Sequence, residues 1–570
     1  MKHPTESKLR RTAHECLYWV HDALPNLGTA GSRSALLHDV DERPTRRSVD
    51  YRELRRFSWL RWLGTVGAIF ILVAGIGAGA TPVVGNAFWA TSLGSVLGRM
   101  LVATTVVTFI GIGLLVVAWL GVGAFVVAGS RTYVSSVTPG MLMRAFAAWS
   151  IPLLFTAPLF TQDIYSYLAQ AAIVERGMDP YSAGPVDLLG PSDPLARSVP
   201  LIWSHSPSPY GPTALSVAWL ISKLTNDAVI ASVFLHRAVA MFSLFVVAWA
   251  LVRLAQRCGI SAQFALWLGI LNPLVLLHLI GGIHNEALLL ALLLSGMELT
   301  LRAILGPPGI RPDSVASVGT SDLSGQPLRL FHLPLYAAGI VLISLAGMVK
   351  VTGFVALGFS GMWLARKFGT GVAAIAKAAA ITAVIAVATA VAVSVASGLG
   401  FGWITAQGGA ATVRSWMSLS TLLGIVAGFF GSLLGLGDVT EAALTLTRGV
   451  GVAIAVAWML RMLFATFRGR IHPLGGYGMS MFVMVLLFPV VHPWYLLWAI
   501  VPLSAWANRI QFRMGVVIYS VVFSFVILPR GLGLPPGTVV QIYLIAVVFF
   551  VALLALILAV SARLKAFRLH

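Results

Sequence analysis

The sequence has 570 residues, of which 58% are hydrophobic and only 10% are charged. A soluble domain is about half apolar and roughly a quarter charged, so this composition excludes an ordinary soluble enzyme. The formal net charge of +19 would suit nucleic-acid binding, but most Lys and Arg residues stand at the ends of apolar segments. That placement is typical of the cytoplasmic flanks of membrane spans, and we expect no nucleic-acid partner.

Long runs almost free of charge recur along the chain. Each is close to the ~20 apolar residues that cross the hydrocarbon core of a bilayer. Clear examples are residues 65–79, 101–129, 228–252, 371–397 and 540–560. Because lipid cannot satisfy backbone polar groups, these runs must be helical. The sequence therefore predicts an all-α polytopic membrane protein.

The N-terminal part of the chain sets the predicted topology. Residues 1–57 are polar and rich in Arg, and we expect them to form a cytoplasmic tail. Apolar spans follow near 58–79, 101–128 and 141–160. Three crossings from a cytoplasmic N-terminus place the next segment, 161–227, outside as a large loop rich in Pro, Ser, Asp and Tyr.

Segment 212–224 is too short to cross the membrane comfortably, so we interpret it as an interfacial helix. With that assignment, the basic residues of the rest of the chain all fall on one side of the membrane. We interpret 420–437 as re-entrant or interfacial. The result is a membrane domain over 58–562 with about 14 spans and a basic C-terminal tail over 563–570. Both termini are then cytoplasmic, in a multi-pass protein of the plasma membrane.

Polar residues gather at the extracytoplasmic ends of these predicted spans. Polar and ionisable groups at membrane depth are costly, so they are candidates for function. A transporter or flippase would instead place them near the bilayer midplane on broken helices, and a non-catalytic scaffold would not require the cluster. The pattern therefore favours an enzyme whose site opens on the extracytoplasmic side.

Asp163 follows the apolar run that ends at Phe160, at the start of an expected amphipathic helix. A carboxylate at the rim of a lipid-facing cavity can take a proton from an acceptor hydroxyl as a general base. The alternative is a helix N-cap, which Asp favours for backbone reasons.

Two cations are candidates for binding a phosphate. Lys350 lies in a hairpin of apolar helices with no acidic residue nearby in the sequence, so it should meet an anion. Arg414 can bind a phosphate bidentately. The alternatives are a lysine that snorkels to the interface and an arginine that anchors there.

Other polar and aromatic residues lie on the same predicted face. His284, Asn285 and Glu286 could bond sugar hydroxyls, form half of a metal site or cap a helix. His492, Trp494 and Tyr495 could equally form an aromatic belt, and Trp203 and Tyr210 could stack on a sugar or only pack. We expect no metal, because no second ligand stands at a fitting helical offset.

Several of these motifs together resemble a known family. Asp163 to Tyr167 reads DIYSY, and it is followed by GMDPY at 177–181, Trp203 and PYGP at 209–212. Later come GGIHNE at 281–286, KVT at 350–352 and HPW at 492–494. In this order they resemble the actinobacterial polyprenyl-phosphate-mannose-dependent α-(1→6)-mannopyranosyltransferases of the MptA/MptB type. The long polar N-terminal tail is more similar to the B form.

The resemblance implies the GT-C glycosyltransferase fold, with a catalytic Asp early in the first large outer loop, which maps onto Asp163. Here that loop follows the third span, so two additional N-terminal helices must be accommodated. The donor would be polyprenyl-phosphate mannose, and the acceptor a phosphatidylinositol mannoside or lipomannan, extended toward lipomannan and lipoarabinomannan. An enzyme with another polyprenyl-phosphate sugar, such as arabinose, remains an alternative.

The resulting hypothesis is an inverting transfer without nucleotide, metal or other cofactor. Asp163 is the expected base. The residues expected to bind the donor or its phosphate are Lys350, Arg414, His284, His492 and Tyr210. The residues expected to bind the sugar or acceptor are Tyr165, Trp203, Asn285, Glu286, Trp494 and Tyr495.

Overall fold

The computed structural model describes residues 50–82, 85–128, 135–307, 332–406, 414–415, 417–531 and 533–567. Most of the predicted tail 1–57 and the last three residues of the tail 563–570 lie outside these ranges. Within them the chain is helical and contains no strand. The first helix begins at Tyr51, inside the predicted tail, because the Asp50 side chain caps it by accepting from the Arg52 and Glu53 N–H groups.

Seven helices of the described residues are long and apolar enough to cross a membrane. They exceed the ~20 residues that a span needs. They are α2 (Tyr51–Ala78), α4 (Leu101–Ala128), α10 (Val229–Arg257), α12 (Glu286–Leu305), α15 (Val372–Ala396), α17 (Thr440–Phe467) and α21 (Pro536–Phe567). The predicted class, an all-α polytopic membrane protein, is therefore confirmed.

Shorter apolar helices complete the bundle, and several are separated only by a short irregular stretch. These helices are α5 (Pro139–Leu153), α11 (Ala262–Gly269), the π-helical η3 (Val275–Gly281), α13 (His332–Gly347), α14 (Val355–Phe368), α16 (Leu419–Leu433), α18 (Pro473–Leu487), α19 (Leu497–Ser504) and α20 (Ile510–Val526). The 3-10 turns η5 (Val351–Phe354) and η8 (Pro493–Leu496) lead into α14 and α19. Helix α16 covers most of the predicted re-entrant segment 420–437, and its 15 residues are too few for an ordinary span.

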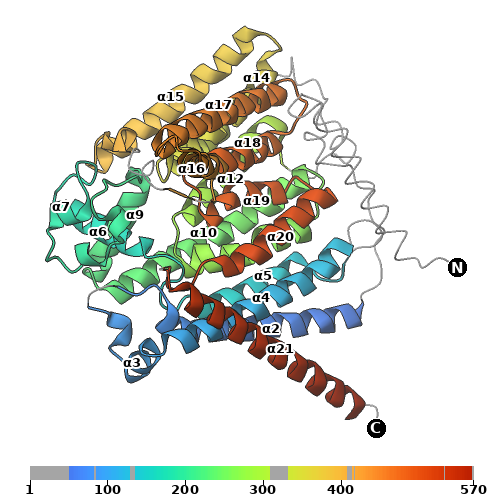
Figure 1. The fold of residues 1–570 in the computed structure, drawn as a ribbon. Coiled ribbons are helices and arrows are strands. Elements are labelled where there is room, and N and C mark those ends of the chain that lie inside the picture. The colour runs from blue at the N-terminus through green and yellow to red at the C-terminus, as the bar shows by residue number, and fades with distance from the viewer. Residues whose placement is uncertain are drawn as a thin grey trace.

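A group of short helices covers one end of the bundle. Figure 1 shows α6, α7 and α9 together at the left, beside one end of α15. The elements of this outer region are η1 (Ala87–Trp89), α3 (Ser92–Gly98), α6 (Asp163–Glu175), α7 (Pro185–Leu189), η2 (Ala196–Ser198), α8 (Leu201–Ser204), α9 (Pro212–Thr225) and η6 (Gly402–Ile404). The start of α2 and the end of α21 lie at the other side of the view.

Close contacts between helices depend on glycines at two crossings. A Cβ atom on Gly67 of α2 would lie 2.6 Å from the Gly111 carbonyl oxygen of α4. A Cβ atom on Gly296 of α12 would lie 2.6 Å from the Gly339 carbonyl oxygen of α13. In a membrane, where burial of apolar surface gives little driving force, such small residues let backbones pack closely. These crossings fix the frame on which the site is built.

Candidate functional site

Two strained backbone turns lead into the site. Phe160 has φ of 68° and Ile283 has φ of 59°, in the left-handed region. That region is costly for residues with a Cβ atom, and such strain persists only where the surroundings impose it, commonly at functional sites. Phe160 comes three residues before Asp163, and Ile283 directly precedes His284. A π-helical segment, itself a feature often found at functional sites, ends at Gly281.

Asp163 is the first residue of α6, and its carboxylate faces two side chains from other parts of the chain. The Trp203 Nε1 atom donates to one oxygen at 3.3 Å, and His284 Nδ1 lies 3.7 Å from the other. Gln162 occupies the N-cap position of α6 without a side-chain bond, so Asp163 is not the cap of this helix. The Asp163 side chain is 18% exposed, which leaves it accessible to a substrate.

Burial raises the pKa of Asp163 above its ordinary value, and the negative charge of Glu286 adds to that rise. The hydrogen bond with Thr161, the charge of Lys350 and the Trp203 N–H oppose it. Burial lowers the pKa of His284 well below the usual histidine value, and the positive charge of Lys350 lowers it further. His284 is therefore neutral near pH 7 and contacts Asp163 as a neutral ring.

Of the two tyrosines in the DIYSY motif, Tyr167 rather than Tyr165 faces the site. The Tyr167 and Tyr210 hydroxyls lie 3.3 Å apart, and their rings meet edge to face. The Tyr165 hydroxyl instead donates to the Ala80 carbonyl oxygen at 3.0 Å. Residues four apart share one helix face and residues two apart do not. The spacing from Asp163 therefore favours Tyr167 as the tyrosine that faces the site. The prediction of Tyr165 from the sequence did not use this spacing.

Lys350 has a carboxylate partner that lies far away in the sequence. Its Nζ atom lies 2.8 Å from Glu286 Oε1, and it also stands over the Tyr495 ring at 4.2 Å and the Trp498 ring at 5.0 Å. Lys350 was expected to meet an anion, and it does, although the anion is a carboxylate of this chain; its binding of a lipid phosphate stays a prediction. An ammonium group has three donors, however, so the bond to Glu286 leaves capacity for an anion.

His492, Trp494 and His284 form a stack of three rings. His492 lies on Trp494 with centroids 4.6 Å apart, and His284 lies on Trp494 with centroids 4.0 Å apart. Asn285 precedes the first residue of α12 at the N-cap position and makes no side-chain capping bond. The stack connects the 492–495 turn to the Asp163 carboxylate through His284.

Arg414 is not joined to this cluster by any bond between the described residues. Its guanidinium pairs with Glu441 in the first turn of α17, and both side chains are largely exposed. The neighbouring Ser415 donates to the Val491 carbonyl oxygen at 2.5 Å, so Arg414 lies at the same end of the bundle as His492. Its phosphate-binding role stays a prediction.

Arg237 is a structural support of the site that the sequence reasoning missed. It is 1% exposed within α10, and its guanidinium donates to the carbonyls of two segments. One is the stretch that leads to Asp163, through Leu154, Thr156 and Ala157; the other is the end of η3, through Ile280 and Gly281. It thereby holds together the two strained segments that carry Asp163 and His284. A buried arginine inside an apolar helix was the available signal.

The structure thus gathers at one end of the bundle the residues that the sequence spread over more than 300 positions. The cluster contains Asp163, Tyr167, Trp203, Tyr210, His284, Asn285, Glu286, Lys350, His492, Trp494, Tyr495 and Trp498. Within the described residues no three His, Cys, Asp or Glu side chains form a group able to hold a metal, and independence from metals stays a prediction.

A membrane helix bundle that gathers an accessible carboxylate, a cation and stacked rings has the parts of a membrane-embedded group-transfer enzyme. Residues 61–366 match a family described as alpha-(1->6)-mannopyranosyltransferase, N-terminal domain. Residues 420–555 match the MptB C-terminal domain. The chain therefore belongs to the α-(1→6)-mannopyranosyltransferase family, and it is a glycosyltransferase. The resemblance drawn from the motifs is confirmed.

Individual relatives align with this chain over most of their length. The chain is 48% identical over 564 residues to alpha-(1->6)-mannopyranosyltransferase B of Corynebacterium glutamicum, which covers 94% of this chain and 90% of that protein. It is 38% identical over 508 residues to an alpha-(1->6)-mannopyranosyltransferase of Mycobacterium tuberculosis, with 86% and 85% covered. The A-type protein of M. tuberculosis is 33% identical over 465 residues, with 80% and 81% covered. No solved structure matches significantly.

Proposed function

We propose that this protein transfers mannose from polyprenyl-phosphate mannose to the α-(1→6)-mannan chain of a phosphatidylinositol mannoside or lipomannan acceptor, with inversion at the anomeric carbon. The names of the family and of its relatives support mannosyl transfer with this linkage. The lipid-linked donor fits a catalytic cluster at the end of apolar helices. The lipid-linked acceptor fits the same position.

The observation that carries the proposal is the setting of the Asp163 carboxylate. It receives one N–H from Trp203 and faces the neutral His284 ring, and no Lys or Arg of the described residues forms an ion pair with it. A carboxylate that is ordered, accessible and not neutralised by a cation can take a proton. Its raised pKa makes it a stronger base than an ordinary aspartate.

In the proposed reaction the acceptor's 6-hydroxyl attacks the anomeric carbon of a β-linked mannosyl phosphate. The new bond joins the acceptor O6 to C1, and the bond between C1 and the phosphate oxygen breaks. Asp163 takes the hydroxyl proton, and the leaving lipid phosphate keeps the electron pair. Attack from the face opposite the phosphate gives the α linkage.

Lys350 is the group proposed to stabilise the leaving phosphate. Its bond to Glu286 fixes the ammonium, which has three donors and so can also bond a phosphate oxygen. A preorganised cation beside the departing oxygen stabilises charge that develops only in the transition state. Tyr210 and His492 are proposed to complete the donor side, and Trp203 and Trp494 to contact sugar rings.

The proposed site faces the extracytoplasmic side of the plasma membrane, with both termini cytoplasmic. The placement of Lys and Arg at segment ends supports this orientation. The GT-C architecture is proposed for the same chain, since an all-helical membrane bundle with its site at the end of the spans is consistent with it.

The test replaces Asp163 with Asn, which keeps the shape but removes the base. We expect kcat to fall by about 10²–10⁴-fold, with donor affinity nearly unchanged, in purified protein supplied with polyprenyl-phosphate mannose and an α-(1→6)-dimannoside. The control is Asp187→Asn, because Asp187 lies in the same outer region but pairs with the exposed His205. Normal turnover by Asp163→Asn would show that Asp163 is not the base. Preference for an arabinose donor would show that mannose is not the transferred sugar.

A further inference from the structure

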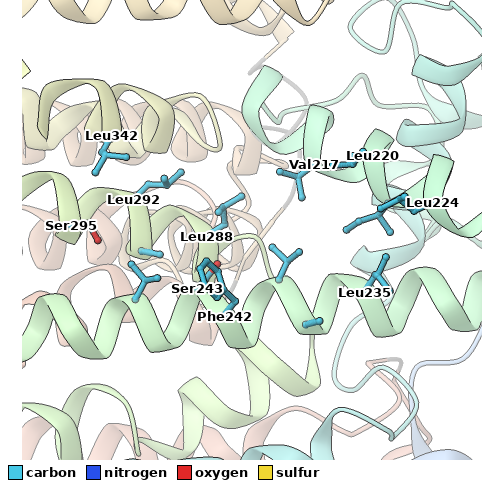
Figure 2. Close-up of a pocket in the computed structure, with 15 residues that line it drawn as sticks. Val217, Leu220, Leu224, Leu235, Phe242, Ser243, Leu288, Leu292, Ser295 and Leu342 are labelled. Carbon is cyan, nitrogen blue, oxygen red and sulfur yellow. The ribbon is translucent and has the colours of Figure 1, made fainter. Parts of the chain in front are cut away.

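A lateral groove of about 470 Å³ lies between α9, α10, α12 and α13 (Figure 2). Its lining is aliphatic or aromatic except for Ser243 and Ser295. Its outer rim includes Leu224 and Phe242, which are 68% and 70% exposed. The groove is therefore open on the side of the bundle and offers a continuous apolar surface.

Each wall is one face of a regular helix. On α12, Leu288, Leu292 and Ser295 are spaced four and three residues apart, and on α9 Val217 and Leu224 are spaced seven apart. Residues with these spacings share one side of a helix. The groove follows the helix axes instead of ending in a local pit.

Three of the four walls belong to helices that begin or end next to residues of the candidate site. Helix α12 begins at Glu286, so Leu288 and Ser295 lie about 3 and 14 Å along its axis from the Glu286–Lys350 pair. Helix α9 follows Tyr210, and the Thr213 N–H bonds the Met348 carbonyl oxygen at 3.2 Å. Helix α13 contributes Leu342 and ends at Gly347, shortly before Lys350. The near end of the groove, at Val217 and Leu288, therefore lies within a few turns of the elements that carry the site, and the groove extends from there along α10 and α12.

We propose that this groove seats the isoprenoid chain of the lipid-linked donor, next to the phosphate position at Lys350. The inference rests on the proposed function. A volume of about 470 Å³ lies within the roughly 300–1,000 Å³ of ligand pockets. A chain attached to a phosphate at Lys350 would enter the groove between α9 and α12 without crossing the bundle.

Shape, rather than hydrophobicity, is the basis of this recognition. A lipid chain leaving the bilayer for an apolar groove gains little from the hydrophobic effect, because lipid tails are already as apolar as leucine. The gain comes from van der Waals contacts, which depend on close fit. The walls combine branched side chains with the small Ala238 and Ala291, and we expect this uneven surface to fit a methyl-branched chain better than a straight acyl chain.

The test narrows the groove with Ala238→Phe, at a site that is exposed in α10. Donors are mannosyl phosphates carrying a long prenyl chain, a linear alkyl chain of equal length or a geranyl-length chain, with a water-soluble α-(1→6)-dimannoside as acceptor. We expect KM for the long prenyl donor to rise by about tenfold or more, with little change for the geranyl-length donor. Ala383→Phe, on the exposed face of α15, is the matched control and should change neither.

Val217→Phe narrows the same groove from α9 and should reproduce the effect if Ala238→Phe does not fold. Equal effects on both chain lengths, no effect in either variant, or a loss of affinity confined to a lipid-linked acceptor would each overturn the proposal. The last result would assign the groove to the acceptor's acyl chains. Failure of the unaltered protein to transfer mannose from any of the donors would instead reject the proposed function.

Discussion

Helix α12 holds two buried glutamates that are each paired with a cation, and the two pairs are built differently. Glu286, the first residue of the helix, makes one bond of 2.8 Å to Lys350. Glu298, about 18 Å further along the axis, accepts two bonds from Arg257, of 2.6 and 2.7 Å, while Arg257 also donates to the Gly306 carbonyl oxygen at 2.9 Å.

The difference shows which pair is available for chemistry. The Arg257–Glu298 pair is bidentate, and its side chains are 4% and 2% exposed, so neither charge can easily turn to a substrate. The Lys350 side chain is 18% exposed, and its ammonium has donors beyond its bond to Glu286. A saturated pair stabilises the bundle, whereas an incompletely bonded pair beside Asp163 can bind an anion.

The strongest test of this contrast removes the Lys350–Glu286 pair without leaving a buried charge. We expect Lys350→Met combined with Glu286→Gln to fold but to lose about 10²–10³-fold in kcat/KM, as removal of a transition-state donor does. Steady-state transfer assays with the purified variant measure it. Near-normal transfer would mean that this pair is only structural.

The matching change at the Arg257–Glu298 pair should affect stability instead. Arg257→Met alone leaves Glu298 buried and unpaired, and we expect a loss of about 3–5 kcal/mol in the free energy of unfolding. Arg257→Met with Glu298→Leu should recover most of that loss. Thermal unfolding in detergent measures both variants, and activity per folded molecule should stay normal. A catalytic defect in the folded double variant would contradict the contrast.

A smaller effect is expected from Trp203→Phe, which removes an N–H that lowers the pKa of Asp163. The base acts only when deprotonated, so activity is present above its pKa and is lost as pH falls through it. Since that pKa is raised, the acidic limb should lie above that of an ordinary aspartate, and in Trp203→Phe it should move to still higher pH. The pH profile of kcat/KM measures this shift. An unchanged acidic limb would show that the Trp203 N–H does not lower the pKa of the base.

The smallest effect should come from Arg414→Ala. The Arg414–Glu441 pair is exposed on both sides, with 55% and 77% of the side chains accessible, and such pairs contribute little. We expect kcat and the donor KM to stay within about threefold of the unaltered protein. A large rise in donor KM would instead support the phosphate-binding role that the sequence predicts for Arg414.

Much of the site could be predicted from the sequence because polar residues inside apolar segments are rare and therefore visible. Asp163, His284, Lys350 and His492 all stood out in this way. The motif alone does not separate Tyr165 from Tyr167, because only positions around a helix show that Tyr167 shares the face of Asp163. The partner of Lys350 was also missed, because Glu286 is 64 residues away in the chain.

The sequence by itself determined the membrane class, the helical content and the family, because these depend on composition, segment length and local motifs. Only the tertiary structure decided the pairing of Lys350 with Glu286, the three-ring stack on Trp494 and the role of Arg237. These features join segments that are far apart in the chain. Such contacts follow from how helices pack and where their backbones break, which no local pattern of residues specifies.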